Sequence, residues 1–385
     1  MPKIEIDDPH KVTPPVNGSN PTVQYPSQRI RSAPEQLKKN HRSTIEKLVT
    51  PSVELMSLVL SFLTTQDIVK YRCYEVSQVW SEACSRVHDI SIKFSNDPDN
   101  QYDRDYMRMI RMTRIGEDLK SIEIQWPGTK DVLDINVANT VRDYLLPRCH
   151  KLRHFTLDTL QRRKRYATML HPIESLSNLK TLKLTNCSFD NTDECTMLIR
   201  NKPQLEVLRF QSARFNLSTN AQYGEFHQAI GKLHKLRELM VTGIFCSGIG
   251  GGPPCPLYPM FTELKELRYV RMGDVDDDCL EAMARHCPNL KQLYLQYCRK
   301  ISMSGVLKVL AACPIEEVSI STEDQRFYDE TDMENVCLAG SALTSLEIRV
   351  IPHPINPPYF VSSRVEKLQD IARCASNGRV SVKFI

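Results

Sequence analysis

A six-residue pattern recurs nine times from residue 119 onward, and it constrains the fold more than any other feature of the sequence. Each copy reads apolar-x-x-apolar-x-apolar, and successive copies start 23 to 33 residues apart. A regular period of this length is typical of a protein in which each unit buries its apolar face only against its neighbours. The copies begin at Leu119, Leu152, Leu179, Leu205, Leu236, Leu267, Leu290, Ile315 and Leu343.

Most of these steps lie in or just above the 20–29 residue range of leucine-rich repeats. The last two apolar residues of each copy are two apart, so both point to the same side of a short strand. Helical patterns at 276–287 and 304–313 lie between copies and are expected to pack behind the sheet. The sequence therefore predicts an α/β solenoid, a curved leucine-rich-repeat domain of about nine repeats.

The cysteines are placed at turns of this predicted solenoid. Some precede a repeat start and others follow a strand, at Cys149, Cys287, Cys313, Cys187 and Cys298. This placement resembles the cysteine-containing class of leucine-rich repeats. Thirteen cysteines is an odd number, and no C-x-x-C occurs, so we expect reduced, buried thiols and no metal site.

A different signal precedes the repeats. Residues 1–47 are rich in proline and polar residues without apolar periodicity, which predicts a disordered tail. The stretch LMSLVLSFL (55–63) then predicts a helix that is apolar on nearly every side. Such a helix needs cover from the rest of the chain, from another protein, or from both.

Two further short helices are expected after it. Thr50 and Pro51 predict the start of the apolar helix, and Thr64 to Asp67 has the spacing of a capping box. A third helix is predicted from an apolar stripe that runs from Val76 to Val87. The three helices occupy fewer than 40 residues, a length that rarely supports an independent core.

A three-helix unit before a cysteine-type solenoid resembles the F-box/leucine-rich-repeat family. Thr50-Pro51 stands for the usual Leu-Pro, and VSQVW (76–80) parallels the end of the F-box pattern, with Gln78 in place of a basic residue. The resemblance implies three parts: a tail (1–47), an F-box-like helical unit (48–92) and a leucine-rich-repeat solenoid (93–385).

In that family the F-box binds a Skp-type adaptor, which connects it to a cullin–RING ligase. The resemblance therefore implies a substrate-recognition subunit of an SCF-type E3 ubiquitin ligase, with a protein substrate on the concave repeat face. The alternative role for each matched residue is to hold the helical unit together. The residues matched to the adaptor interface are Pro51, Leu55, Val59, Leu63, Ile68, Val76 and Trp80.

Outward-pointing strand residues form the predicted concave surface. Cations and tyrosines at mid-solenoid favour a recognised segment that carries acidic or phosphorylated side chains. A solvated face of mixed charge is the alternative, since glutamates share the surface. The predicted substrate-binding residues are Lys183, Arg209, Met240, Tyr269, Arg271, Gln292 and Tyr294.

Composition and missing motifs narrow the function classes. A net charge of +4 does not indicate a nucleic-acid or membrane surface, and no apolar run approaches a membrane span. No catalytic or nucleotide-binding motif occurs, so we expect a non-catalytic protein without cofactors. The start carries acids and lacks a signal-peptide core, so a cytoplasmic or nuclear location is expected. A leucine-rich-repeat interaction scaffold without a ligase role remains the alternative.

Overall fold

One parallel sheet runs through the part of the chain that the structure, a computed structural model, describes. That part is residues 52–95, 100–126, 131–159, 167–189, 192–215, 220–243, 256–298, 300–322, 330–350 and 362–384. These residues belong to the second of two units, Pro51–Ile385. The predicted tail and the predicted helix start at Thr50 and Pro51 lie outside the described residues.

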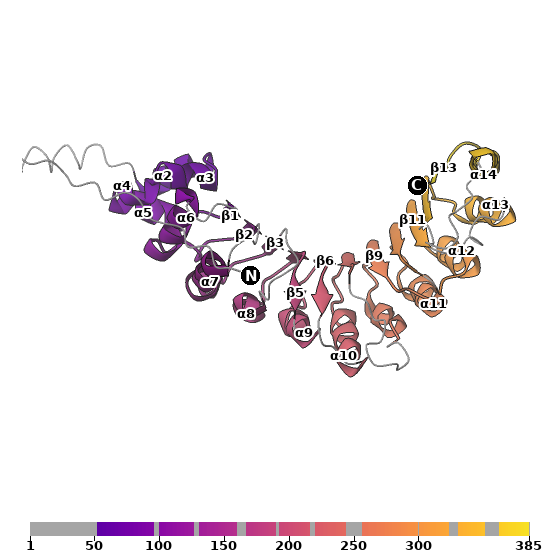
Figure 1. The fold of residues 1–385 in the computed structure, drawn as a ribbon, viewed down its shortest axis with the longest axis horizontal. Helices are drawn as coiled ribbons and strands as arrows, with labels where there is room; N and C mark the ends of the chain where they lie inside the picture. Colours follow the sequence, from indigo (N-terminus) through magenta and orange to yellow (C-terminus); the bar gives the residue numbers. More distant parts are fainter. Residues whose placement is uncertain are drawn as a thin grey trace, which may run out of the picture. The chain divides into compact units, whose positions relative to one another are not determined.

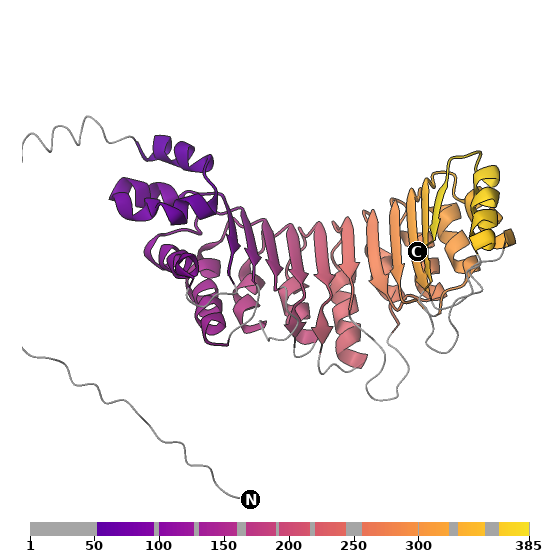
Figure 2. The ribbon, with the colours of Figure 1, turned by 45° about the horizontal axis from the view of Figure 1, so that its top comes forward.

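Each of the nine sequence segments contains a strand of this sheet, and the strands lie in sequence order (Figures 1 and 2). The nine strands are β2 (Ser121–Gln125), β3 (His154–Asp158), β4 (Thr181–Thr185), β6 (Val207–Gln211), β8 (Glu238–Val241), β9 (Tyr269–Gly273), β10 (Gln292–Gln296), β11 (Glu317–Thr322) and β12 (Ser345–Val350). All neighbouring pairs are parallel. The α/β solenoid architecture is therefore present.

The sheet extends by one strand beyond the nine segments at each end. The added strands are β1 (Asp89–Lys93), which pairs with β2, and β13 (Ser381–Phe384), which pairs with β12. β1 crosses the predicted boundary at residues 92/93, so the sheet begins within the predicted helical unit. A separate two-stranded parallel ladder joins β5 (Ser188–Phe189) to β7 (Arg214–Phe215).

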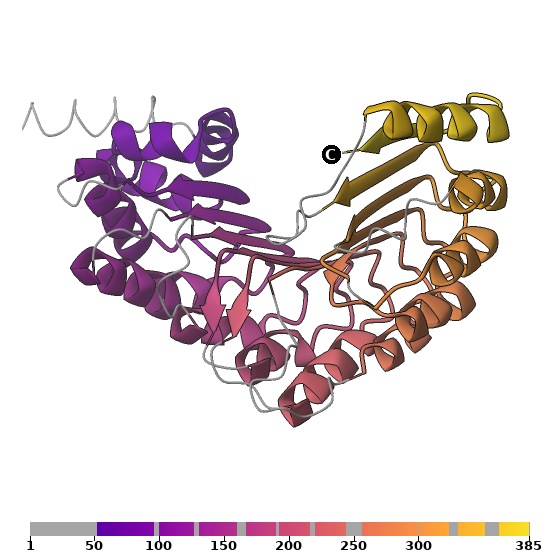
Figure 3. The ribbon, with the colours of Figure 1, turned by 45° about the vertical axis from the view of Figure 1, so that its right-hand side comes forward.

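Helices cover one face of the sheet, and the strands lie on the inner side of the curve (Figure 3). A helix is about 10 Å wide, whereas neighbouring strands are only ~4.8 Å apart, so a sheet backed by helices bends toward its open face. The covering helices are α6 (Gln101–Met112), α7 (Asp131–Thr140), α8 (Ala167–Leu170), α9 (Thr192–Arg200), α10 (Asn220–Gly231), α11 (Asp277–His286), α12 (Met303–Ala312), α13 (Glu330–Ala339) and α14 (Ser362–Ala375).

Short helical turns complete this layer. They are η1 (Val141–Leu145), η2 (Leu146–Arg148), η3 (His171–Ser175) and η4 (Tyr258–Glu263). Two of the helices, α11 and α12, are those predicted at 276–287 and 304–313. Asp276 begins α11 by accepting a hydrogen bond from the Cys279 amide (3.0 Å), and Ser302 accepts from the Gly305 amide (3.2 Å) to begin α12.

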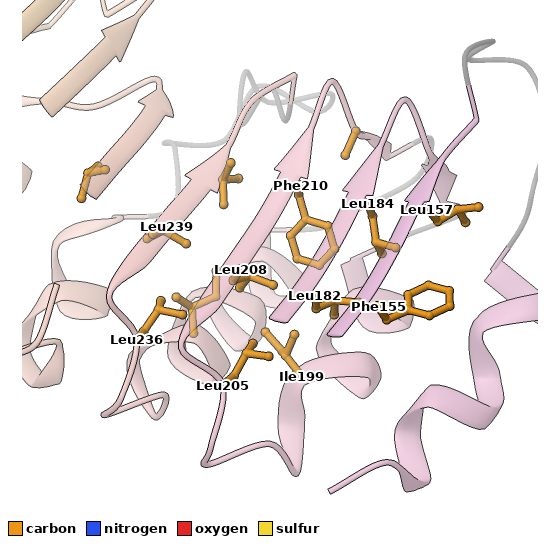
Figure 4. Close-up of a cluster of buried hydrophobic side chains, with 14 of the residues drawn as sticks. Phe155, Leu157, Leu182, Leu184, Ile199, Leu205, Leu208, Phe210, Leu236 and Leu239 are labelled. Carbon is orange, nitrogen blue, oxygen red and sulfur yellow. The ribbon is translucent and has the colours of Figure 1, made fainter. Parts of the chain in front are cut away.

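The core fills the space between the sheet and the helices. In the middle of the sheet, Leu182, Leu184, Leu208 and Phe210 point from neighbouring strands toward Ile199 of α9 (Figure 4). All five side chains are fully buried. Because each unit supplies only a few such residues, the core exists only when neighbouring units stack.

The helical unit consists of α2 (Val53–Ser61), α3 (Thr65–Lys70), α4 (Cys73–Val76) and α5 (Gln78–Ser85). The capping box of α3 is confirmed: Thr64 and Asp67 exchange backbone and side-chain hydrogen bonds at 3.1 Å. Ser52 caps α2, with its hydroxyl 3.2 Å from the Leu55 amide. The unit shares one core with the sheet, which agrees with its small size.

The prediction of one continuous third helix from Val76 to Val87 is wrong at both ends. Ser77 is extended, with φ −163° and ψ 171°, and separates α4 from α5. Its hydroxyl accepts from the Trp80 amide, so it acts as a helix cap rather than as a helical residue. Val87 lies beyond α5 and precedes β1. Val87, Ile90 and Ile92 have the apolar-x-x-apolar-x-apolar spacing of the repeated segments. The apolar stripe of residues 76–87 therefore combines a helix with the start of a strand.

Candidate functional site

One side of α2 carries large apolar side chains that the chain leaves exposed. We name Leu55, Leu58, Val59 and Phe62 the α2 apolar face. Their exposed fractions are 52%, 56%, 41% and 80%. Positions i, i+3, i+4 and i+7 lie along one side of a helix. Clustered exposure of this kind marks an interaction surface more often than scattered single residues do.

The opposite side of α2 is buried within the molecule. Met56 and Leu60 are 5% and 1% exposed and belong to the common core. An ion pair between Arg86 Nη1 and Glu54 Oε1 at 3.0 Å links the first turn of α2 to the end of α5. The chain therefore covers one half of the predicted apolar helix and leaves the other half open.

Polar contacts connect the helical unit to the beginning of the sheet. Arg72 Nη2 lies 3.4 Å from Asp105 Oδ1, and Arg108 Nε lies 3.0 Å from Glu75 Oε1. The Ser91 amide of β1 donates to the Thr65 hydroxyl at 3.1 Å. These contacts join α3 and α4 to α6 and β1, and α2 is linked to the same unit through the ion pair between Glu54 and Arg86.

The seven residues matched to an adaptor interface occupy different environments. Leu55, Val59 and Val76 are exposed, the last by 61%. Leu63 and Trp80 are half-buried against the core, and Ile68 is 3% exposed. Pro51 lies outside the described residues. Adaptor binding by this set stays a prediction, and the geometry assigns Ile68 to the support of the surface.

The sequence did not single out three exposed apolar residues of this region. They are Leu58, Phe62 and Tyr71, with exposed fractions of 56%, 80% and 63%. A helix that is apolar on nearly every side has no polar face to mark which side meets solvent. The only available signal was the i, i+3, i+4 and i+7 spacing of Leu55 with Leu58, Val59 and Phe62.

The second candidate surface is the open face of the sheet. Strand pairing aligns Lys183, Arg209, Met240, Arg271 and Tyr294 in one line across five strands, which we name the central row. Tyr269 and Gln292 are aligned in the neighbouring line. The register thus brings together all seven residues predicted to bind substrate, and their binding role stays a prediction.

Neighbouring side chains hold several of these residues in place. Arg209 pairs with Glu238, which raises the pKa of the Arg209 guanidinium. The rings of Tyr269 and Tyr294 are 5.3 Å apart, and Tyr294 Oη donates to Glu317 Oε2 at 2.5 Å. Burial and this carboxylate raise the pKa of the Tyr294 phenol, which therefore stays protonated at neutral pH.

Arg271 and Met240 have different surroundings from the rest of the central row. With its carboxamide oxygen facing the guanidinium, Gln296 accepts from Arg271 Nη2 at 2.7 Å and from Nε at 3.2 Å. A neutral amide leaves the Arg271 charge uncompensated. Met240 is only 4% exposed although it points to the open face. It therefore offers little surface to a partner.

A row of basic residues that the apolar pattern does not mark lies where the strands begin. Each precedes its strand by one residue. Backbone hydrogen bonds connect neighbouring positions of this line, as from the Arg268 amide to the Arg237 carbonyl (2.8 Å), and Glu206 occupies the position between Lys180 and Arg237. The signal was present as the second letter of segments such as LRYVRM. The members of this basic edge row are Lys120, Arg153, Lys180, Arg237, Arg268 and Lys291.

The cysteines at the turns are buried packing residues. Cys149 Sγ lies 3.1 Å from the Leu145 carbonyl, and Cys313 Sγ lies 3.3 Å from the Cys287 carbonyl. Burial raises the pKa of the Cys149 and Cys287 thiols to about 12, so both are protonated. In the described ranges, no three His, Cys, Asp or Glu side chains are placed to hold a metal ion.

Among the described helices, none has both the length and the apolar character needed to cross a lipid bilayer.

The chain was compared with protein families, curated proteins and solved structures. No protein-family model matches it, and no curated protein matches it in sequence. Among solved structures it is similar to one described as the crystal structure of the Rad7 and Elc1 complex in yeast. The sequence identity is 12%, the TM-score is 0.37, and the match covers 89% of this chain and 91% of that chain.

Proposed function

We propose that this chain is the substrate-recognition subunit of an SCF-type E3 ubiquitin ligase. In this proposal residues 48–92 act as an F-box that binds a Skp-type adaptor, and the adaptor connects the chain to a cullin and a RING subunit. The solenoid, with about nine leucine-rich repeats of the cysteine-containing class, binds the protein substrate. The α2 apolar face is the observation that carries the proposal.

Partner binding explains why these side chains are exposed. The four side chains Leu55, Leu58, Val59 and Phe62 are only partly exposed, and together they expose about as much as two fully exposed side chains. Fully burying one such side chain contributes about 1.5–3 kcal/mol, so removing the four from water would stabilise a complex by roughly 3–7 kcal/mol. Val76 and Tyr71 are exposed on the same small helical unit and can widen the contact. The buried Met56 and Leu60 keep the helix fixed when the adaptor is absent.

The chain contributes proximity rather than chemistry in this proposal. The ubiquitin-transfer step belongs to the cullin–RING partners, and the open sheet face holds the substrate near them. Binding both partners in one assembly makes the transfer effectively intramolecular. We propose accordingly that the protein is not an enzyme, needs no cofactor, and acts in the cytoplasm or the nucleus.

The test is direct binding to a purified Skp-type adaptor. Calorimetry of the full chain should detect a complex, and Leu58→Asp combined with Phe62→Asp should abolish it, because two carboxylates would be buried in an apolar contact. Leu338→Asp is the matched control, since Leu338 is 60% exposed on α13.

Each outcome separates the two function classes. Loss of binding in the double variant, with binding kept by Leu338→Asp, supports the receptor. A full chain that is folded but does not bind the adaptor overturns the proposal. It would leave the alternative, a leucine-rich-repeat interaction scaffold without a ligase role.

A further inference from the structure

Positive charge is concentrated in the middle of the open sheet face. From β4 to β10, the residues that precede or point outward from the strands include seven cations and only two carboxylates. The cations are Lys180, Lys183, Arg209, Arg237, Arg268, Arg271 and Lys291, and the carboxylates are Glu206 and Glu238. On β11 and β12 the balance reverses, with Glu316, Glu317 and Glu347 against Arg349.

Several of these cations are already neutralised within the chain. Arg209 pairs with Glu238, Lys180 Nζ lies 2.8 Å from Glu206 Oε1, and Lys291 Nζ lies 2.5 Å from Glu316 Oε1. Arg237 Nη1 shares Glu206 at 3.7 Å. Among the described residues, no carboxylate pairs with the remaining three cations, which are Lys183, Arg268 and Arg271.

Lys183 on β4 and Arg271 on β9 belong to the same central row. Between them come Arg209, which Glu238 compensates, and Met240, which is buried. Three strand spacings of ~4.8 Å place Lys183 and Arg271 roughly 14 Å apart. An extended segment rises about 3.4 Å per residue, so residues i and i+4 are also separated by roughly 14 Å.

We propose that the open face recognises an extended acidic segment of its protein partner, with carboxylates four residues apart bound by Lys183 and Arg271. This inference rests on the proposed function, because it assigns the substrate to the sheet face. Arg268, which precedes the same strand as Arg271, adds positive charge at the β9 end. The glutamates of β11 and β12 repel such a segment and confine it to β4–β9.

A matched set of peptides and variants tests this proposal by fluorescence anisotropy. The probe is a labelled 13-residue Gly/Ser peptide with Glu at positions 5 and 9, and the controls carry Gln or Lys at both positions. The full chain should bind the Glu peptide at least about tenfold more tightly than the Gln peptide, and higher salt should weaken binding.

Charge reversal gives the sharpest readout. Lys183→Glu with Arg271→Glu should weaken binding of the Glu peptide at least about tenfold and should create binding of the Lys peptide. Lys308→Glu with Arg373→Glu makes the same change of net charge on the helices α12 and α14. That control should bind the Glu peptide as the unaltered chain does.

Several results would overturn the inference. These are equal binding of the Glu and Gln peptides, no effect of the Lys183 and Arg271 reversal, binding only of a phosphoserine version, or tighter binding of a 13-nucleotide oligo-dT. Failure of the proposed function is distinguishable, because adaptor binding is measured separately. The Lys183→Glu/Arg271→Glu variant should keep adaptor binding, and Leu58→Asp/Phe62→Asp should keep peptide binding.

Discussion

Arg379 Nη2 donates to the backbone carbonyl of Cys337 at 3.0 Å and so connects the start of the last strand to α13. Its Nη1 donates to the carbonyls of Gly340 and Leu343. In the register of β13 on β12, Arg379 occupies the place that the repeat leucine Leu343 holds in the segment before. A guanidinium thus replaces an apolar residue by satisfying three carbonyl groups.

Replacing Arg379 should therefore loosen the C-terminal end of the sheet. Arg379→Ala leaves the three carbonyls without this donor, and we expect the free energy of unfolding to fall by about 2–3 kcal/mol. Hydrogen exchange of the β13 amides should accelerate, while exchange in β4 should not change. Arg373→Ala is the control, because Arg373 pairs with exposed Asp370, and its effect should stay within about 0.5 kcal/mol.

The repeated six-residue apolar pattern predicts the strands in the interior of this sheet better than those at its ends. Nine segments are found by apolar spacing alone, because each strand must bury two alternate residues. β13 lacks the first apolar residue, since Arg379 takes its place through hydrogen bonds that no apolar pattern reveals. At β1, Val87, Ile90 and Ile92 have the complete apolar pattern, but Val87 also fits the apolar stripe that predicts the preceding helix.

For the candidate surfaces, the sequence predicts the direction of the strand side chains but not their burial or their ion pairs. Alternation along a strand identifies which residues point to the open face, so the central row follows from the sequence. Alternation does not reveal burial by neighbours on that face, and Met240 is buried there. It also does not reveal which cations are paired: Arg209 is compensated by Glu238, whereas Lys183 has no carboxylate partner among the described residues.

Lys202 lies in a turn position where other repeats carry an apolar residue. Lys202-Pro203 stands where Cys287-Pro288 stands before LKQLYL. The side chain is fully buried, and its Nζ donates to the Glu174 carbonyl at 3.1 Å. Burial lowers the pKa of Lys202 from 10.5 to about 8. At pH 7 the charged form is therefore held in an unfavourable environment.

Lys202→Met should stabilise the protein at neutral pH. The unfolded chain binds more protons than the folded one between about pH 8 and 10.5, so the unaltered protein gains stability as the pH rises through that window. We expect the free energy of unfolding of the variant to be about 1–3 kcal/mol higher at pH 7 than that of the unaltered protein. This range includes the loss of the hydrogen bond to Glu174. That gain should nearly disappear at pH 10.5.

Urea unfolding at both pH values measures the effect on Lys202. Exposed Lys232 supplies the control, because Lys232→Met removes the same charge without removing a buried one. A Lys202→Met gain that is independent of pH would show that packing, rather than the buried charge, is responsible.

His227 changes stability with pH in the same direction as Lys202, but in a more acidic pH window. It is 5% exposed on α10, its ring is 6.3 Å from that of Tyr223, and burial lowers its pKa from 6.5 to about 4. In the unfolded chain His227 becomes protonated below about pH 6.5, whereas in the folded chain it becomes protonated only below about pH 4. Its contribution is therefore complete above pH 6.5 and is lost as the pH falls, by about 2 kcal/mol between pH 7 and pH 5.

The measurement for His227 is the difference in unfolding free energy between pH 7 and pH 5. His227→Leu should reduce this difference by about 2 kcal/mol relative to the unaltered chain. His150→Leu, at an exposed position, should leave it unchanged. Carboxylates that titrate in the same range contribute equally to all three proteins and cancel in the comparison. An unaltered pH dependence in His227→Leu would contradict the assignment.

Substitutions of Leu60 and Phe62, on the buried and exposed sides of α2, should differ in their effects on stability. Leu60 is 1% exposed and Phe62 is 80% exposed. Leu60→Ala leaves a cavity in the shared core and should lower the free energy of unfolding by about 2–4 kcal/mol. Phe62→Ala removes a side chain that water already surrounds, so its effect should stay within about 0.5 kcal/mol in the isolated protein. Chemical unfolding of both variants measures the contrast. A Phe62→Ala cost as large as that of Leu60→Ala would mean that this chain covers Phe62 by itself, and the α2 apolar face would then not be free for an adaptor.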